Sequence, residues 1–151
     1  MAAQIVLTWY FDVEISQSDS QTCQDTVSKT LPYLQSLLSP QPDQDISISL
    51  ILIDDKHITN LNAEFRGLKK PTDVLTFTEI FSDKPRVGSE VDAEIYISID
   101  TAMKQASEHN LSLVEELSLL SFHGLLHAIG YDHETSAEDA QEMRYEEAKL
   151  L

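Results

Sequence analysis

The chain has 151 residues, 42% of them hydrophobic, which predicts one domain over residues 1–151 with enough apolar side chains for a core. Its 26 acidic and 10 basic residues give a formal net charge of −16, which excludes a basic coat that binds nucleic acid non-specifically. Any contact with RNA or DNA therefore needs a local patch or a metal ion.

The first third of the chain predicts two strands separated by a helix. Residues 4–15 alternate and are rich in β-branched and aromatic side chains, which is typical of a strand. Residues 18–39 carry apolar side chains at helical spacing, although Pro32 lies inside this pattern and would kink or restart the helix. The aliphatic run at residues 46–53 predicts a second strand that is buried on both faces.

The middle of the chain predicts a short helix, a loop and a third strand. Asp54 or Asp55 can cap a helix that reaches Phe65. Residues 66–71 read as a loop, and residues 72–77 as a strand.

The rest of the chain is also predicted to contain both strands and helices. Residues 82–92 contain proline, glycine and charges and predict a loop, and residues 94–97 predict a fourth strand. Residues 100–110 predict one helix, a capping box at Ser112 begins another, and the last helix begins near residue 135. The interleaving predicts an α/β-type domain of two or three layers, with a mixed sheet of about four strands.

Cysteine usage and hydropathy bear on the cellular compartment. The single cysteine, Cys23, excludes an internal disulfide, and we expect it to fill space in the core. We expect no signal peptide, and the longest aliphatic run, at residues 50–53, is far too short for a membrane span. We therefore expect a cytoplasmic protein without a membrane partner.

The strongest functional signal is a group of histidines between residues 123 and 133. His123 and His127 lie four residues apart on a helix that is apolar almost all round, so both imidazoles can reach one ion. Gly130 can end that helix in a left-handed turn that brings His133 back toward them. Three imidazoles and one open position are typical of a catalytic zinc site at the end of a buried helix.

Two alternatives bear on this interpretation. A single core histidine is usually only hydrogen-bonded, but three of the five histidines share this segment, whereas His57 and His109 stand alone and are expected on the surface. The spacing H-x-x-x-H-x-x-G-x-x-H is that of the metzincin peptidases, which carry a glutamate base directly after the first histidine. Here that position is Gly124, which argues against peptidase chemistry.

Residues 123–133 resemble the signature of the YbeY family, the bacterial endoribonucleases and rRNA maturation factors, which reads H-G-x-L-H-x-x-G-Y-D-H. A second segment, residues 61–77, is similar to the family pattern L-N-x-x-[YF]-R-x-x-x-x-P-T-D-V-L-S-F. A weaker match lies at residues 94–98, where Glu94 follows alanine instead of the usual glycine.

The resemblance implies an α+β fold with one zinc ion held by the three histidines at the end of a cleft. It also implies cleavage of single-stranded RNA, maturation of the 16S rRNA 3′ end and a role in ribosome quality control. The arginine of the family maps to Arg66, and its functionally important first histidine maps to His123.

A short basic cluster, formed by Arg66, Lys69 and Lys70, fits this implication because a guanidinium matches phosphate oxygens. A solvated loop with an arginine–carboxylate pair is the alternative. Asp73 could orient a histidine or cap a turn, and Asp132 is a further candidate for the shell around the ligands, although a turn-forming role is favoured there.

These observations leave three functional hypotheses. The first is a zinc-dependent endoribonuclease with Arg66 and His123 as catalytic residues. The second is a non-catalytic ribosome-assembly factor whose zinc is structural, and the third is a metal-dependent hydrolase of another substrate. The charge of −16 predicts weak intrinsic affinity for RNA, so we expect targeting by small-subunit ribosomal proteins or an assembly GTPase.

Overall fold

A computed structural model describes residues 3–38, 42–80 and 91–130, and these form a four-stranded sheet in the order β1-β2-β4-β3. The strands are β1 (Ile5–Phe11), β2 (Ile46–Ile53), β3 (Val74–Thr78) and β4 (Ala93–Ser98). The helices are α1 (Gln17–Ser28), α2 (Leu31–Leu37), α3 (Asp55–Arg66), α4 (Ile99–His109) and α5 (Leu113–Ala128). Strands β1, β2 and β4 are parallel, and β3 is antiparallel to β4. The prediction of an α+β fold with a mixed sheet is confirmed.

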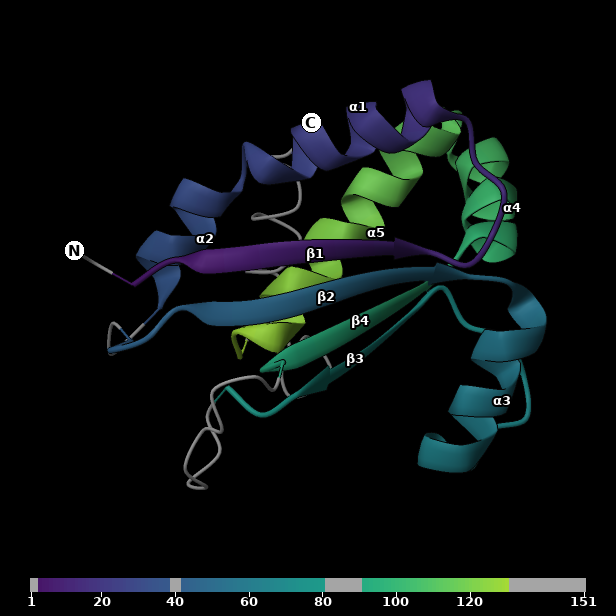
Figure 1. Cartoon of the computed structure of the whole chain (residues 1–151). Helices are drawn as coiled ribbons and strands as arrows, with labels where there is room; N and C mark the ends of the chain where they lie inside the picture. The colour runs from purple at the N-terminus through teal and green to yellow at the C-terminus, as the bar shows by residue number, and fades with distance from the viewer. Residues whose placement is uncertain (1–2, 39–41, 81–90, 131–151) are drawn as a thin grey trace.

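Helices cover both faces of the sheet, but unequally. Helix α5 packs against β3, β4, α1 and α4, and the larger core lies on this side (Figure 1). A smaller cluster lies on the opposite face, where Ile58 of α3 meets Ile51, Ile53 and Leu75. Strand β3, at the edge of the sheet, therefore lies between α3 on one face and α5 on the other.

The central strand β2 has the predicted bounds and burial. Seven of its eight residues are buried, because β1 and β4 flank it, the larger core covers one face, and Ile58 of α3 packs on Ile51 and Ile53 on the other. Strand β1 is shorter than predicted. Phe11 pairs with Leu52, the backbone N–H of Asp12 donates to the Leu52 carbonyl at 2.9 Å, and β2 ends one residue later. The alternating sequence pattern continues to residue 15, but β2 offers no partner residues beyond this point, so the strand ends.

The helical pattern over residues 18–39 restarts at Pro32 rather than bending. Helix α1 ends at Ser28, and α2 begins at Leu31 with Pro32 in its first turn, where a missing N–H costs nothing. Helix α4 begins one residue earlier than predicted, because the Ser98 side chain accepts a hydrogen bond from the Thr101 N–H at 3.2 Å. The predicted last helix, and residues 82–90 of the predicted loop, lie outside the described residues.

The expectation that Cys23 fills space in the core is confirmed. Its side chain is buried between α1 and α5, where the Ser118 hydroxyl donates to Sγ at 3.8 Å. Burial raises the pKa of the thiol to about 11, and the hydroxyls of Ser118 and Ser121 offset only part of this rise. No helix within the described ranges has the length and apolar character needed to cross a bilayer.

Candidate functional site: a cleft with two histidines

A cleft of about 430 Å³ runs along the outer edge of β3. Residues 72–77 form one side of it, Phe65 and Arg66 reach it from α3, and His123 and His127 reach it from α5. The cleft thus joins the two segments that carry the sequence motifs.

Backbone groups of the edge strand face this cleft. Ser98 N donates to the Asp73 carbonyl at 2.9 Å, and Glu79 N donates to the Asp92 carbonyl at 2.8 Å. Because bonded pairs alternate along an antiparallel ladder, the N–H and C=O of Thr76 point away from β4. The main-chain N–H and C=O of Thr76 therefore lie at the open edge of the sheet.

His123 and His127 lie one helical turn apart on α5 with their rings together. Their Nε2 atoms are 2.9 Å apart, the ring centroids are 4.6 Å apart, and both side chains are half-buried. Two neutral imidazoles can share one proton in this geometry, or both can offer a lone pair to a cation.

The pair fits one zinc ion. Two nitrogens on a tetrahedral zinc are roughly 3.3 Å apart, so a shift of a few tenths of an ångström would let both contact it. Within the described ranges no group of three or more metal-ligating side chains is present, and the predicted third ligand, His133, lies outside them, as does Asp132. The helix does end as predicted, with Gly130 at a φ of 106°.

Gly124 faces the sheet, not the cleft. A Cβ at this position would lie 2.6 Å from Cγ2 of Ile95 and 3.3 Å from Cγ2 of Val74. The absence of a side chain lets α5 approach β4 and β3 closely. The residue after His123 therefore cannot supply a base to the cleft, which gives a physical reason for the departure from the metzincin pattern.

Arg66 is the last residue of α3, and the chain reverses directly after it. Gly67 adopts a left-handed conformation with φ at 70°, as a helix C-terminus favours. Asn62, which is buried, makes two hydrogen bonds to the loop that follows. Its carbonyl accepts from Leu68 N at 3.3 Å, and its side-chain amide donates to the Lys70 carbonyl at 2.9 Å.

The other predicted residues lie as follows. Lys69 and Lys70 are exposed on this loop and are not among the residues that line the cleft. Asp73 lines the cleft, but its carboxylate accepts from its neighbour Val74 N at 2.7 Å and from Gln105 Nε2 at 3.3 Å. These contacts tie the Asp73 carboxylate to the start of β3 and to α4.

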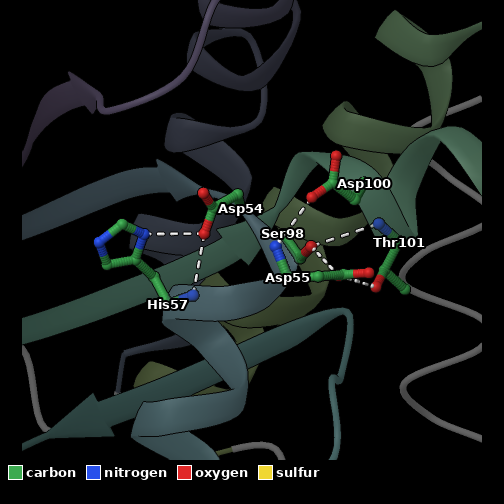
Figure 2. Close-up of polar contacts among 6 residues, drawn as sticks. All are labelled: Asp54, Asp55, His57, Ser98, Asp100 and Thr101. Atoms are coloured by element: carbon green, nitrogen blue, oxygen red, sulfur yellow. Dashed lines mark hydrogen bonds and ion pairs between the residues drawn. The ribbon is translucent and has the colours of Figure 1, made fainter.

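A polar network fixes the start of α3, at the end remote from Arg66 (Figure 2). The Asp55 carboxylate accepts hydrogen bonds from Ser98 Oγ at 2.5 Å and from Thr101 Oγ1 at 2.7 Å. In return, the Asp100 carboxylate accepts from Asp55 N at 2.9 Å. The first turns of α3 and α4 are therefore hydrogen-bonded to each other, which anchors the helix that carries Arg66.

The remaining histidines lie on the surface as expected. His57 is 65% exposed, and its Nδ1 lies 2.7 Å from the Asp54 carboxylate that caps α3. Both the backbone N–H and the ring of His57 lower the pKa of Asp54. His109 is 55% exposed and contacts the buried carboxylate of Glu116 at 3.1 Å.

The sequence interpretation missed the aromatic side of the cleft. The Phe65 and Phe77 rings meet edge to face, with centroids 5.0 Å apart, and Phe77 meets Tyr96 in the same way at 5.9 Å. One signal was available, since Phe65 continues the apolar stripe of Ile58 and Leu61 on α3.

Fold and site together define a class of protein, a small α+β domain whose edge-strand cleft combines a pair of histidines with an arginine. A profile of the family described as "Endoribonuclease YbeY" matches residues 11–151. The chain belongs to this family.

Individual relatives agree. Endoribonuclease YbeY of Desulforamulus reducens is 42% identical over 121 residues, which cover 77% of each chain. The protein of the same name from Leptospira biflexa is 36% identical over 134 residues, covering 89% of this chain and 86% of the relative. The solution structure of TM1509 from Thermotoga maritima matches with a TM-score of 0.62 at 26% identity, covering 96% of this chain and 86% of that one.

Proposed function

We propose that this protein is a zinc-dependent endoribonuclease that cleaves single-stranded RNA in rRNA processing. The single observation that carries this proposal is the cleft, where Arg66 of α3 and the histidine pair of α5 line one cavity. Family membership supports the RNA substrate, because the curated relatives are named endoribonucleases. Maturation of the 16S rRNA 3′ end and a role in ribosome quality control belong to the same proposal.

The histidines and Arg66 would have different roles in this reaction. His123 and His127, with His133, would hold the zinc ion. When bound, zinc would polarise the phosphate and make a water molecule more acidic. The Arg66 guanidinium would grip the scissile phosphate through its fork of N–H donors and offset the negative charge that develops on the oxygens.

The attacking group is either water or the neighbouring ribose 2′-hydroxyl. Attack by the 2′-hydroxyl leaves a cyclic phosphate, whereas attack by water does not, so the product ends identify it. Gly124 cannot act as the base because it has no side chain, and a Cβ added there would meet Ile95 in the sheet.

The net charge of −16 opposes binding of the negatively charged RNA backbone. We expect weak binding of naked RNA that falls steeply with added salt. Delivery to the substrate would then come from a protein partner, either a small-subunit ribosomal protein or an assembly GTPase, in the cytoplasm. Tight RNA binding that persists at high salt would contradict this part of the proposal.

The deciding experiment compares RNA cleavage by the zinc-loaded chain with that of Arg66→Ala and His123→Ala, purified in parallel. Lys104→Ala and His57→Ala are the controls: Lys104→Ala removes one positive charge, as Arg66→Ala does, and His57→Ala removes a histidine, each at an exposed position outside the cleft. We expect a fall of about 100-fold or more for Arg66→Ala and no change for the controls. Equal cleavage by all five preparations would indicate a contaminating nuclease and refute the proposal.

A non-catalytic assembly factor is the second candidate, and the lack of a base beside His123 favours it. In that case the wild-type chain would bind zinc without cutting RNA. The only effect of His123→Ala would then be a lower free energy of unfolding.

A further inference from the structure

Phe65 is exposed in a way that the packing of its own helix does not explain. It lies on the same stripe of α3 as Ile58, which is fully buried, and Leu61, which is half-buried. Phe65 itself is 58% exposed. The ring at the end of this stripe lines the cleft that Arg66, His123 and His127 also line.

One neighbouring ring supports Phe65, and more than half of Phe65 remains exposed. Phe77 of β3 contacts it edge to face at 5.0 Å, and the planes are inclined by 66°. Phe77 is held in turn by Tyr96, whose hydroxyl donates to Glu94 at 3.0 Å. An edge-to-face contact covers at most one face of the Phe65 ring, so a second face is left for a planar partner.

The chemistry of the cleft selects the partner. Unpaired bases stack on exposed aromatic rings, and such stacking tolerates any sequence because every base has a π-face. Arg66 lines the same cleft as Phe65, so a base stacked on Phe65 would bring a neighbouring phosphodiester of the strand toward the guanidinium. We propose that Phe65 is a stacking platform for one unpaired base of the RNA strand, adjacent to the phosphate that Arg66 holds. This inference rests on the proposed RNA substrate.

The platform has a functional meaning. A duplex cannot present a free base face, so only a strand with an unstacked nucleotide would seat its phosphate at Arg66. Selectivity for single strands would then come from an uncharged ring, which suits a chain of charge −16.

The test is a double-mutant cycle between the ring and the base. The probe is an oligouridylate of about eight nucleotides, 2′-O-methylated to block 2′-hydroxyl attack, with an abasic site at each position in turn. Binding to the full chain at low salt is followed by fluorescence anisotropy, and gels check that the probe stays intact. The variants are Phe65→Leu and Phe65→Trp, with Tyr10→Leu as control because Tyr10 is 50% exposed on the opposite edge strand.

One abasic position should weaken binding to the wild type by at least about fivefold. Phe65→Leu should weaken binding of the intact probe by a similar factor and remove the penalty at that position alone. Phe65→Trp should keep both the affinity for the intact probe and the penalty at that abasic position. Tyr10→Leu should change neither quantity. In cleavage assays Phe65→Leu should raise KM more than it lowers kcat.

The two proposals can fail separately. Unchanged affinity and an unchanged abasic profile in Phe65→Leu would refute the platform while leaving cleavage by the wild type intact, and would assign the exposed ring to a protein partner instead. Coupling between ring and base without any cleavage would support the platform and refute the nuclease. A wild-type chain that neither binds nor cuts RNA would refute both.

Discussion

Replacing Gly124 by alanine would test how closely α5 must approach the sheet. The new Cβ would lie 2.6 Å from Cγ2 of Ile95, against an ordinary contact of 3.4–4 Å, so about 1 Å of separation must be gained. Ile95 is completely buried, and its Cγ2 is fixed directly to the branched Cβ, so this methyl cannot swing aside. The helix itself must move.

Two opposing effects set the size of the change. Alanine in a helix interior is favoured over glycine by about 1 kcal/mol. Overpacking of a core costs about 1–3 kcal/mol, and a contact of 2.6 Å lies at the upper end of that range. We therefore expect Gly124→Ala to lower the free energy of unfolding by about 1–2 kcal/mol, which corresponds to a fall in Tm of about 3–6 °C.

Urea denaturation followed by circular dichroism measures the change, and a double-mutant cycle with Ile95→Ala locates it. Ile95→Ala removes the clashing methyl, so it should cost less in the Gly124→Ala background than in the wild type. RNA cleavage by Gly124→Ala should fall at temperatures where the variant is still folded, because the displaced helix carries both histidines. A variant at least as stable as the wild type would refute the close approach.

Three further predictions concern residues away from the histidines. Cys23, whose pKa burial raises to about 11, should resist iodoacetamide at pH 8 in the folded chain and react in urea, and rapid alkylation of the folded chain would contradict its burial. Glu115 accepts from the backbone of Ser112 at 2.9 Å, which lowers its pKa below 4.5, so its stabilising effect is complete above pH 4.5 and is lost as the pH falls through its folded-state value. The stability difference between wild type and Glu115→Gln should therefore shrink below pH 4.5 in a urea series, and a pH-independent difference would refute this reasoning. Asn62→Ala leaves the Lys70 carbonyl without its donor and should cost about 1–3 kcal/mol in urea denaturation together with reduced RNA cleavage, whereas unchanged stability would show that the amide does not hold the loop.

Local signals predicted the fold best where they were strong. The aliphatic run of β2 marked both of its ends, and the capping box at Ser112 marked the start of α5. The end of β1 was predicted too late, because a strand ends where its partner ends, and the pairing of Phe11 with Leu52 is not written in the local sequence.

The same distinction applies to the site. The spacing of His123 and His127 places both on one face of a helix, which the sequence can predict alone. Their meeting with Arg66 in one cleft depends on β3 lying between α3 and α5, which only the tertiary structure provides. Phe65 was overlooked because an apolar residue on a helical stripe ordinarily predicts burial.

The open edge of β3 has a consequence for self-association. An unpaired strand edge invites another chain to add a strand, yet an edge that forms the side of a cleft must remain accessible. Here the strand has only five residues, and Asp73 already occupies the backbone N–H of Val74, so little of the edge can act as a template. Mutual repulsion between copies of charge −16 adds a second barrier, and this barrier weakens as salt screens it. The acidity that hinders RNA binding would therefore also keep the cleft of one molecule clear of the next.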